Sequence, residues 1–385
     1  MNVYLETLGC RLNYSEMEAL SRQLTAIGHG VVAVAQEADV CVLNSCAVTA
    51  EAARKSRQAA RHLARANPTA RLAVTGCYAT LAPAEVAQLA NVQLVVENQR
   101  KELLAELLQP WSVELDGESW RRLEPAASLQ PAARTRAFVK VQDGCNNHCT
   151  FCIVTVARGE ERSRPLDDIV AEIRQLVAEG YREAVLTGVH VAGYGSDLGS
   201  SLHELVAAIL QQTDLPRLRL SSLEPWDLEL AFFDLWPASD GRLCPHLHLP
   251  LQAGCDRTLR RMARRTRCED FRRLVGTARE RIASLAVTTD IIVGFPGETE
   301  ADFQASLRFV EELAFAHVHV FPYSARAGTA AARFGHQAPP AVRRERVAAL
   351  QALAQRSGRA VRQSFLGAVR PVLWETLERP ADGDS

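Results

Sequence analysis

The sequence has almost no lysine. Its 44 basic residues include only Lys55, Lys101 and Lys140, and the other 41 are arginine. Arginine is the better residue for bidentate contacts with phosphate, although genome composition can produce the same bias. Because the formal net charge is −1, the chain does not bind polyanions through bulk positive charge. Any contact with a nucleic acid must come from local clusters of arginine.

Long apolar runs are also missing. No stretch of about 18 apolar residues occurs, so no membrane-spanning helix is predicted. The first ten residues lack the basic start and apolar core of a secretory signal. The chain is 47% hydrophobic and 23% charged, which is typical of globular domains and excludes a disordered or collagen-like protein. Its 385 residues predict two or three domains, and we expect a cytoplasmic protein.

Ten cysteines are present, and in a reducing compartment they are expected to bind metal or take part in redox chemistry. Cys145, Cys149 and Cys152 have C-x3-C-x2-C spacing. A loop of this length can direct three thiolates at three irons of one 4Fe–4S cluster. The fourth iron is then left open for a substrate, whereas an electron carrier closes that corner with a fourth cysteine.

Two alternatives stay open for this loop. His148 would complete a Cys3His zinc set, although adjacent His148 and Cys149 would have to reach the same small ion. The three cysteines could also be purely structural. Their spacing resembles that of the radical S-adenosylmethionine (SAM) superfamily, and this resemblance implies that SAM chelates the open iron through its amino and carboxylate groups.

A second set of cysteines is scattered along the first 80 residues. Cys10, Cys46 and Cys77 each end a short apolar run that reads as a buried strand. Helical segments follow at about 14–27, 49–66 and 82–90. Because the carboxyl ends of strands in a doubly wound parallel sheet share one edge, we expect these three thiols to converge. The remaining cysteines are expected to be core or incidental residues: Cys41, Cys244, Cys255 and Cys268.

Prolines and polar residues at 111–134 predict a linker, and a different architecture follows it at 135–364. Six strand-like runs alternate there with helical stretches. The runs are 137–143, 183–189, 217–222, 246–251, 287–295 and 317–323. Six such units predict an open (β/α)6 barrel. The C-x3-C-x2-C loop follows the first run, at the carboxyl mouth where barrel enzymes place their chemistry.

Four more residues are expected at this mouth. Gly188 would admit the methionyl part of SAM, Glu224 and Gln252 would form hydrogen bonds with SAM, and Gly294 in the GFPGE turn would approach the adenine. Each of these residues also has an ordinary interpretation as a turn or scaffold residue. His246 and His248 occupy alternating strand positions and are expected to pack in the core or to face the substrate.

Several blocks together make the chain similar to one radical SAM family, the methylthiotransferases. These blocks are TLGCRLN, NSCAVTAEAARKSRQAAR, RGEERSR, SSLEP, HLHLPLQAG and DIIVGFPGE. The resemblance implies an N-terminal methylthiotransferase domain at 1–110 and two 4Fe–4S clusters. The auxiliary cluster would be held by Cys10, Cys46 and Cys77, and the SAM cluster by the barrel loop. Thr155, where relatives often have proline, and Cys255, where serine is common, depart from the family pattern without touching a ligand.

The N-terminal blocks most resemble the threonylcarbamoyladenosine-tRNA branch. This implies transfer of a methylthio group to carbon 2 of N6-threonylcarbamoyladenosine at position 37, beside the anticodon, with SAM cleaved to a 5′-deoxyadenosyl radical. The implied partners are tRNA, an electron donor such as flavodoxin or ferredoxin, and a sulfur source. Isopentenyladenosine in tRNA or an aspartate of a ribosomal protein are alternative substrates. A non-catalytic electron carrier is a further alternative, but both triplets lack the fourth ligand that it needs.

The last expectations concern RNA binding. Phe365–Glu375 resembles the first strand of a TRAM domain, which makes 365–385 a truncated TRAM-like segment. One strand cannot close a barrel, so contact with RNA phosphate is expected elsewhere. Residues 257–281 could be a solvated helical face paired with Asp256, Glu269, Asp270 and Glu280, but their ten arginines are expected to contact phosphate. They are Arg257, Arg260, Arg261, Arg264, Arg265, Arg267, Arg272, Arg273, Arg279 and Arg281.

Overall fold

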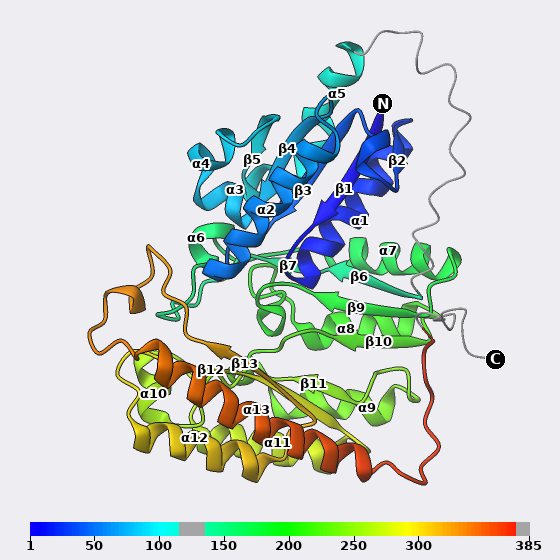
Figure 1. The fold of residues 1–385 in the computed structure, drawn as a ribbon. Helices are drawn as coiled ribbons and strands as arrows, with labels where there is room; N and C mark the ends of the chain where they lie inside the picture. Colours follow the sequence, from blue (N-terminus) through cyan, green and yellow to red (C-terminus); the bar gives the residue numbers. More distant parts are fainter. Residues whose placement is uncertain (115–134, 375–385) are drawn as a thin grey trace, which may run out of the picture.

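The computed structural model describes residues 1–114 and 135–374. The N-terminal part is a five-stranded sheet in the order β2-β1-β3-β4-β5, with every neighbouring pair parallel (Figure 1). The strands are β1 (Asn2–Thr7), β2 (Gly30–Val32), β3 (Val40–Ser45), β4 (Arg71–Gly76) and β5 (Val92–Val96). The order reverses between β1 and β3, and ligands bind at such switch points in open α/β sheets.

Helices cover both faces of this sheet, as predicted for a doubly wound domain. Leu24 of α1 packs with Val42 in one apolar cluster, whereas Leu63 of α2 packs with Leu43 in the other. Successive residues of β3 therefore face opposite cores, which is typical of a buried parallel strand. Cys41 belongs to the second cluster, so its assignment to the core is confirmed. The helices are α1 (Arg11–Ala26), α2 (Ala50–Ala66), α3 (Cys77–Leu81), α4 (Pro83–Ala87) and α5 (Leu104–Glu114).

Two helix boundaries differ from expectation. The helix expected at 82–90 does start at Pro83, but it is shorter, since α4 ends at Ala87. An additional short helix, α3, precedes it, and the two are separate because Pro83 has no N–H to continue α3. Helix α5 runs through Pro110 to Glu114, so the first residues of the expected linker are helical. Residues 115–134 of that linker lie outside the described residues.

The second part is the predicted open (β/α)6 barrel. It contains two three-stranded parallel sheets, β6-β9-β10 and β11-β12-β13. Parallel bridges from Leu218 to Leu243 and from Ser222 to His248 join them. The strands are β6 (Arg136–Lys140), β9 (Glu183–Thr187), β10 (Arg217–Leu220), β11 (His246–His248), β12 (Ala286–Val293) and β13 (His317–Pro322). Each of these strands lies inside one of the expected runs or begins one residue before it.

Amphipathic helices form the outer layer of the barrel. Alternate residues of β12, such as Val287 and Ile291, pack with helix residues such as Phe271. The residues between them, such as Asp290, are only partly buried and face the barrel interior. The longer helices are α7 (Leu166–Ala178), α8 (Leu202–Gln212), α11 (Cys268–Arg281), α12 (Glu300–Leu313) and α13 (Pro340–Gln363), and the shorter ones are α6 (Val154–Arg158), α9 (Leu235–Ala238) and α10 (Asp256–Arg261).

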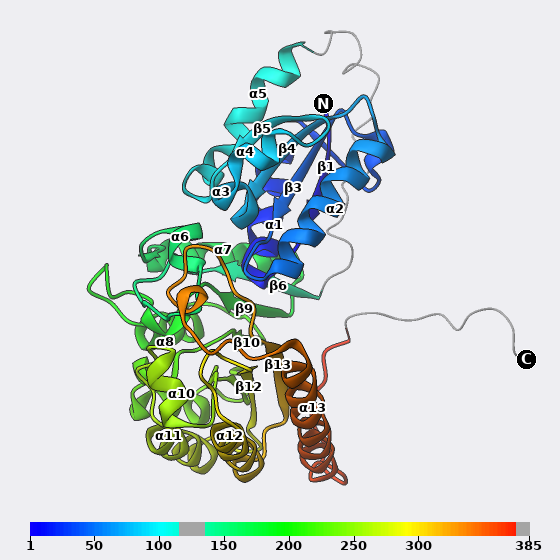
Figure 2. The same ribbon diagram turned by 60° about the vertical axis from the view of Figure 1, so that its left-hand side comes forward.

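The N-terminal domain rests on the first strand of the barrel, with α1 beside β6 (Figure 2). The Tyr14 and Phe138 rings lie 6.4 Å apart across this contact. The backbone N–H of Lys140 donates to Ser15 Oγ at 3.0 Å. A short antiparallel pair, β7 (Gln142–Asp143) and β8 (Arg162–Ser163), extends the barrel toward the N-terminal sheet. The carboxyl end of the N-terminal sheet and that of the first barrel sheet are therefore close together.

The expected TRAM-like strand does not form in the described residues. Residues 365–374 contain no strand, and Leu366, Val369 and Trp374 are exposed. A strand needs partners for its backbone groups, and no described segment pairs with this one. Residues 375–385 lie outside the described residues. Among the described helices, none is both long and apolar enough to cross a lipid bilayer.

Candidate functional site

The three scattered cysteines converge at one edge of the N-terminal sheet. Cys46 and Cys77 directly follow β3 and β4, and Cys10 comes three residues after the end of β1; the three strands are neighbours in the sheet. Burial, together with the nearby thiols of Cys77 and Cys10, raises the pKa of Cys46 to about 11. A Cβ atom added to Gly9, which has φ +104°, would lie 2.8 Å from Cys46 Sγ. The predicted convergence is confirmed, and it depends on a glycine before Cys10.

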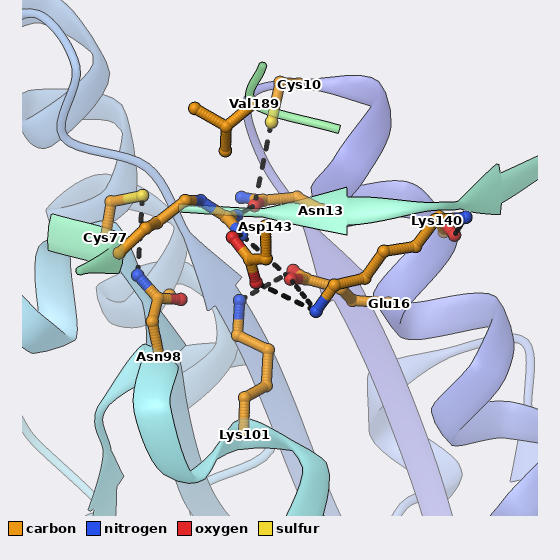
Figure 3. Close-up of polar contacts among 12 residues, drawn as sticks. Cys10, Asn13, Glu16, Cys77, Asn98, Lys101, Lys140, Asp143 and Val189 are labelled. Atoms are coloured by element: carbon orange, nitrogen blue, oxygen red, sulfur yellow. Dashed lines mark hydrogen bonds and ion pairs between the residues drawn. The ribbon is translucent and has the colours of Figure 1, made fainter. Parts of the chain in front are cut away.

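Polar side chains contact two of these thiols, those of Cys10 and Cys77 (Figure 3). Cys10 Sγ donates to Asn13 Oδ1 at 3.8 Å, and Asn98 Nδ2 donates to Cys77 Sγ at 3.7 Å. The same Asn98 amide also donates to the carbonyl of Ala157 at 2.7 Å. Because Ala157 belongs to α6, the polar shell of the Cys77 thiol is fixed to the barrel.

A buried ion network borders the Cys10 thiol through Asn13. Arg158 donates to Asn13 Oδ1 at 2.6 Å and forms ion pairs with Glu16 at 3.0 Å and Asp143 at 2.9 Å. Lys101 Nζ lies 2.7 Å from Glu16 Oε2. Burial opposes ionisation of Glu16, but Lys101, Arg158 and Lys140 hold its pKa far below the usual range. The network joins residues from both domains and places positive charge beside thiols that a metal needs deprotonated.

The C-x3-C-x2-C loop lies at the carboxyl mouth of the barrel, as predicted. The N–H of Cys145 donates to the carbonyl of Gly159 at 3.1 Å, and the N–H of Cys152 donates to the carbonyl of Cys149 at 3.0 Å. The sulfurs of Cys145 and Cys152 each accept a backbone N–H at 3.4 Å. Burial raises the pKa of Cys152 to about 12, and the thiols of Cys149 and Cys145 add to this effect.

The spacing of these sulfurs fits a cluster better than a single ion. In residues 1–114 and 135–374, one group of His, Cys, Asp or Glu has its ligand atoms within 4.8 Å of one another, namely His248, Asp290 and His319. Neither cysteine triplet forms such a group. A tetrahedral zinc site needs its ligands that close, whereas each cysteine of a 4Fe–4S cluster binds a different iron. The donor sets therefore fit two clusters, and the zinc alternative with His148 is disfavoured.

Arg264 stands beside the barrel loop. Its guanidinium donates to Cys149 Sγ at 3.7 Å and to Glu224 Oε2 at 2.6 Å, and it lies 4.2 Å from the centre of the Trp226 ring. Its side chain is 2% exposed. The prediction that Arg264 contacts RNA phosphate is therefore wrong, because this buried arginine is already paired. The sequence placed it in a basic segment, but only the fold shows that it turns inward.

Other arginines of residues 257–281 also have partners in the protein. Arg257 pairs with Asp302 at 2.5 Å and Arg281 with Asp234 at 2.9 Å. Arg279 donates to the carbonyl of Leu313. Arg265 is different, since its side chain is 65% exposed and lies 3.6 Å from Asp227. The segment is thus less available to phosphate than its composition indicates.

The four residues expected to contact SAM lie at the mouth, at the ends of β9 to β12 or just beyond. A Cβ on Gly188 would lie 2.9 Å from the carbonyl of Gln142, and a Cβ on Gly294, which has φ +70°, would lie 2.4 Å from Arg343 Cγ. Packing within the protein therefore explains both glycines. Gln252 continues the sheet, because its N–H donates to the carbonyl of Asp290 at 2.8 Å. Contact of Glu224 and the other three with SAM stays a prediction.

His190 was not predicted as a site residue, but its ring bridges two acidic side chains at the barrel mouth. Its Nδ1 lies 2.9 Å from Glu161 Oε1, and its Nε2 lies 2.7 Å from Asp227 Oδ2. Burial alone would lower the pKa of His190, but the hydrogen bonds with Asp227 and Glu161 raise it to about 9. The protonated ring therefore holds together three loops that surround the cysteine loop.

Comparisons with known proteins agree with this architecture. Residues 2–97 match the family model described as "Uncharacterized protein family UPF0004", and residues 139–310 match the radical SAM superfamily. The radical SAM methyltransferase TsrM from Kitasatospora setae has a similar fold, with a TM-score of 0.63 and 16% identity over 83% of this chain and 72% of its own. The cobalamin-dependent radical enzyme OxsB has a TM-score of 0.54 and 10% identity over 92% of this chain and 56% of its own.

Curated relatives are much closer in sequence. The threonylcarbamoyladenosine tRNA methylthiotransferase MtaB of Bacillus subtilis is 37% identical over 97% of this chain and 84% of its own length. The enzyme of the same name from Thermotoga maritima is 37% identical over 97% and 86%. The tRNA-2-methylthio-N(6)-dimethylallyladenosine synthase of Thermobifida fusca is 39% identical over 94% and 76%. The chain therefore belongs to the radical SAM tRNA methylthiotransferases.

Proposed function

We propose that this enzyme transfers a methylthio group to carbon 2 of N6-threonylcarbamoyladenosine at position 37 of tRNA. The substrate is that of the Bacillus, Thermotoga and other relatives with the same name, which match over most of both chains. Relatives named for N6-dimethylallyladenosine also match over most of this chain. Dimethylallyladenosine is therefore the second candidate substrate.

The observation that supports this chemistry is the pair of cysteine triplets on facing domains. Each triplet supplies three thiols, and the buried Arg158–Glu16 ion pair fixes the two domains to each other. Replacement of an aromatic hydrogen by sulfur is beyond ordinary acid–base chemistry. When bound, the barrel cluster with SAM would supply a radical, and the auxiliary cluster would present the sulfur.

The protein's own residues would hold these groups in place. Gly9 leaves room for the Cys46 thiol, and Arg264 donates to Cys149 Sγ from a buried position. Asn98 donates to Cys77 Sγ. Hydrogen bonds of this kind orient metal ligands and tune the metal that they bind. Glu224, Gln252, Gly188 and Gly294 are the proposed contacts of SAM at the barrel mouth.

The proposal also names partners. The reaction needs an external electron donor, such as flavodoxin or ferredoxin, and a source of sulfur for the auxiliary cluster. Because the substrate is tRNA, the cytoplasm is the proposed location. Exposed arginines of the barrel, such as Arg265, are proposed to position the RNA backbone without reading its bases.

The test is an anaerobic assay with two synthetic anticodon stem-loops. One carries threonylcarbamoyladenosine at position 37 and the other carries dimethylallyladenosine. Reconstituted enzyme, SAM and a reductant should give a methylthio product, detected by mass spectrometry, from the first RNA and little from the second. Preferential conversion of the dimethylallyl RNA would overturn the proposed substrate.

A further inference from the structure

Strand β13 is an open edge of the barrel. It is the last strand in the order β11-β12-β13, and no other described strand pairs with its outer side. In a parallel pair, alternate residues bond to the neighbouring strand. The N–H of Ala316 donates to the carbonyl of Val287, so the N–H groups of His317, His319 and Phe321 point away from β12. The edge therefore offers hydrogen-bond donors to a ligand.

A groove of about 530 Å³ lies between this edge and helix α13, which runs beside β13 in both ribbon views (Figure 1, Figure 2). On β13 the groove extends from Ala316 to Phe321, and on α13 from Gln351 to Arg362. Each of these stretches is about 16 Å long, at about 3.3 Å per residue in a strand and 1.5 Å in a helix. Because α13 runs back from the barrel mouth, Phe321 lies at the mouth end of the groove.

Among the described residues, no carboxylate lines this groove. Its polar side chains are those of His317, His319, Gln351, Gln355 and Arg362. A second groove, between α1 and α7, is different because five carboxylates line it: Glu16, Glu102, Asp143, Asp168 and Glu172. The groove beside β13 is therefore the one whose lining suits an anionic ligand.

Helix α13 adds positive charge beside the groove, since it contains six arginines and only one acidic residue. Arg343 donates to the carbonyl of Tyr323, and Arg346 pairs with Glu298. The other four arginines are exposed and have no ion pair or hydrogen bond within the described part of the chain: Arg344, Arg356, Arg359 and Arg362. In contrast to Arg257 and Arg281 of the segment 257–281, they are available to phosphate.

The arginines at the two ends of α13 lie on the same side of the helix. Arg344 and Arg362 are 18 residues apart (362 − 344), which is about five full turns at 3.6 residues per turn. Since Arg362 lines the groove, Arg344 lies on the side of α13 that faces it. The positive side chains therefore follow the groove along its length.

An exposed aromatic ring lies at the mouth end of the groove. The Phe321 side chain lines it and is 44% exposed. Unpaired bases of RNA stack on such rings, whereas the bases of a duplex are already stacked on one another. A row of arginines with an aromatic ring at one end thus fits a single strand of nucleic acid.

We propose that this groove binds the single-stranded RNA next to the target adenosine, with Arg359 and Arg362 at its phosphates and Phe321 stacked on one of its bases. The inference rests on the proposed function, in which the target base lies beside an anticodon, in a loop of unpaired nucleotides. Phe321 is at the carboxyl end of β13, the same end of the barrel as the C-x3-C-x2-C loop. A strand in the groove therefore leads to the barrel mouth.

RNA binding to the reconstituted enzyme without reductant tests this surface apart from catalysis. A fluorescent anticodon stem-loop is titrated with enzyme at several salt concentrations. Arg359→Gln combined with Arg362→Gln should weaken binding. The slope of log affinity against log salt should become shallower by about 1.4, because each lost contact with a phosphate of a single strand contributes about 0.7. Phe321→Leu should weaken binding about fivefold or more without changing the slope.

The matched control is Arg61→Gln combined with Arg65→Gln. These two arginines are also exposed, and they lie in the last two turns of α2, at the end of the N-terminal sheet away from the cysteines. The control variant should keep the wild-type affinity and slope. Iron content and the midpoint of thermal unfolding show that each variant is folded and holds its clusters. Wild-type affinity and slope in the folded Arg359 and Arg362 variant would overturn the proposal.

Hydrogen exchange tests the contact at the edge strand itself. The anticodon stem-loop should slow exchange in the peptide that contains His317, His319 and Phe321, and a duplex of the stem without its loop should protect this peptide less. An arginine-rich groove also suits an acidic protein, so flavodoxin is the second probe. Protection by flavodoxin but not by the stem-loop would show a docking surface for a protein and would overturn the proposal.

This result is separable from the choice of substrate. Contacts with the backbone and with a neighbouring base do not involve the N6 substituent, so stem-loops with threonylcarbamoyladenosine and with dimethylallyladenosine should lose affinity equally in the Arg359 and Arg362 variant. Loss with only one of the two RNAs would contradict the proposed contacts. Conversion of the dimethylallyl RNA alone would overturn the proposed function and leave this surface in place.

Discussion

The Arg158 guanidinium lies 3.0 Å from the Glu16 carboxylate and joins helix α6 of the barrel to helix α1 of the N-terminal domain. Both side chains are almost completely buried. Asp143, also buried, is the second carboxylate on the same guanidinium. The relative position of the two cysteine triplets is therefore fixed by a charged contact that neither domain contains by itself.

Replacing Arg158 with methionine should be costly. The variant leaves the carboxylates of Glu16 and Asp143 buried with only Lys101 and Lys140 to compensate them, and breaking a buried ion pair in this way costs about 3 kcal/mol. The midpoint of thermal unfolding should fall by several degrees. Arg54→Met, which removes an exposed arginine paired with Glu51, should leave the midpoint nearly unchanged. Equal effects of the two substitutions would contradict this role of the network.

The His190 clamp predicts how stability depends on pH. Its pKa of about 9 in the folded protein exceeds the unfolded value of about 6.5. The stabilisation is therefore complete below pH about 6.5 and is lost as pH rises through 9. The difference in unfolding midpoint between wild type and His190→Gln should be largest near pH 6 and should shrink by pH 10. A difference that grows with pH would show that the ring is neutral in the folded state.

Arg264 should support the barrel cluster and not the RNA. Arg264→Met removes the hydrogen bonds to Cys149 and Glu224, and loss of such an outer contact lowers metal affinity or activity by about tenfold or more. Iron in the barrel site and cleavage of SAM should both decrease, while affinity for tRNA stays unchanged. Arg265→Met, at an exposed neighbour, should show the reverse pattern. Weaker tRNA binding in Arg264→Met with intact SAM cleavage would restore the original phosphate interpretation.

The two triplets should assemble their clusters independently. Reconstituted wild-type enzyme should contain about eight irons per chain, and alanine at Cys145, Cys149 and Cys152 should leave about four. Alanine at Cys10, Cys46 and Cys77 should also leave about four, and this variant should still cleave SAM but give no methylthio product. The assignment would be contradicted if the wild type held only four irons or bound zinc stoichiometrically. It would also be contradicted if the variant with alanine at Cys10, Cys46 and Cys77 folded but no longer cleaved SAM.

Much of the site could be predicted from the sequence, because the order of the strands determines which cysteines come together. Cys10, Cys46 and Cys77 each end a short apolar run, and parallel strands bring such ends to one edge. The barrel loop was evident from its spacing alone. The register of alternate residues on β12 likewise separates core positions from Asp290, which faces the interior.

The features of the site that could not be predicted from the sequence depend on contacts between distant segments. Arg264 lies in a run of arginines that looks solvated. Only the hydrogen bonds from Thr150 to the carbonyls of Arg261 and Met262 bring this segment, and Arg264 with it, beside Cys149. Arg158 and Glu16 are 142 residues apart, so no local pattern pairs them. The strand expected at Phe365–Glu375 from its resemblance to a TRAM domain has no pairing partner among the described residues.

Mass spectrometry of tRNA nucleosides tests the central claim most directly. Cells that lack this enzyme should accumulate N6-threonylcarbamoyladenosine and contain no 2-methylthio derivative of it. The wild-type enzyme should restore the derivative, and the Cys10→Ala variant should not. An unchanged level of 2-methylthio-N6-threonylcarbamoyladenosine in cells without the enzyme, or loss of the dimethylallyl derivative in its place, would contradict the account.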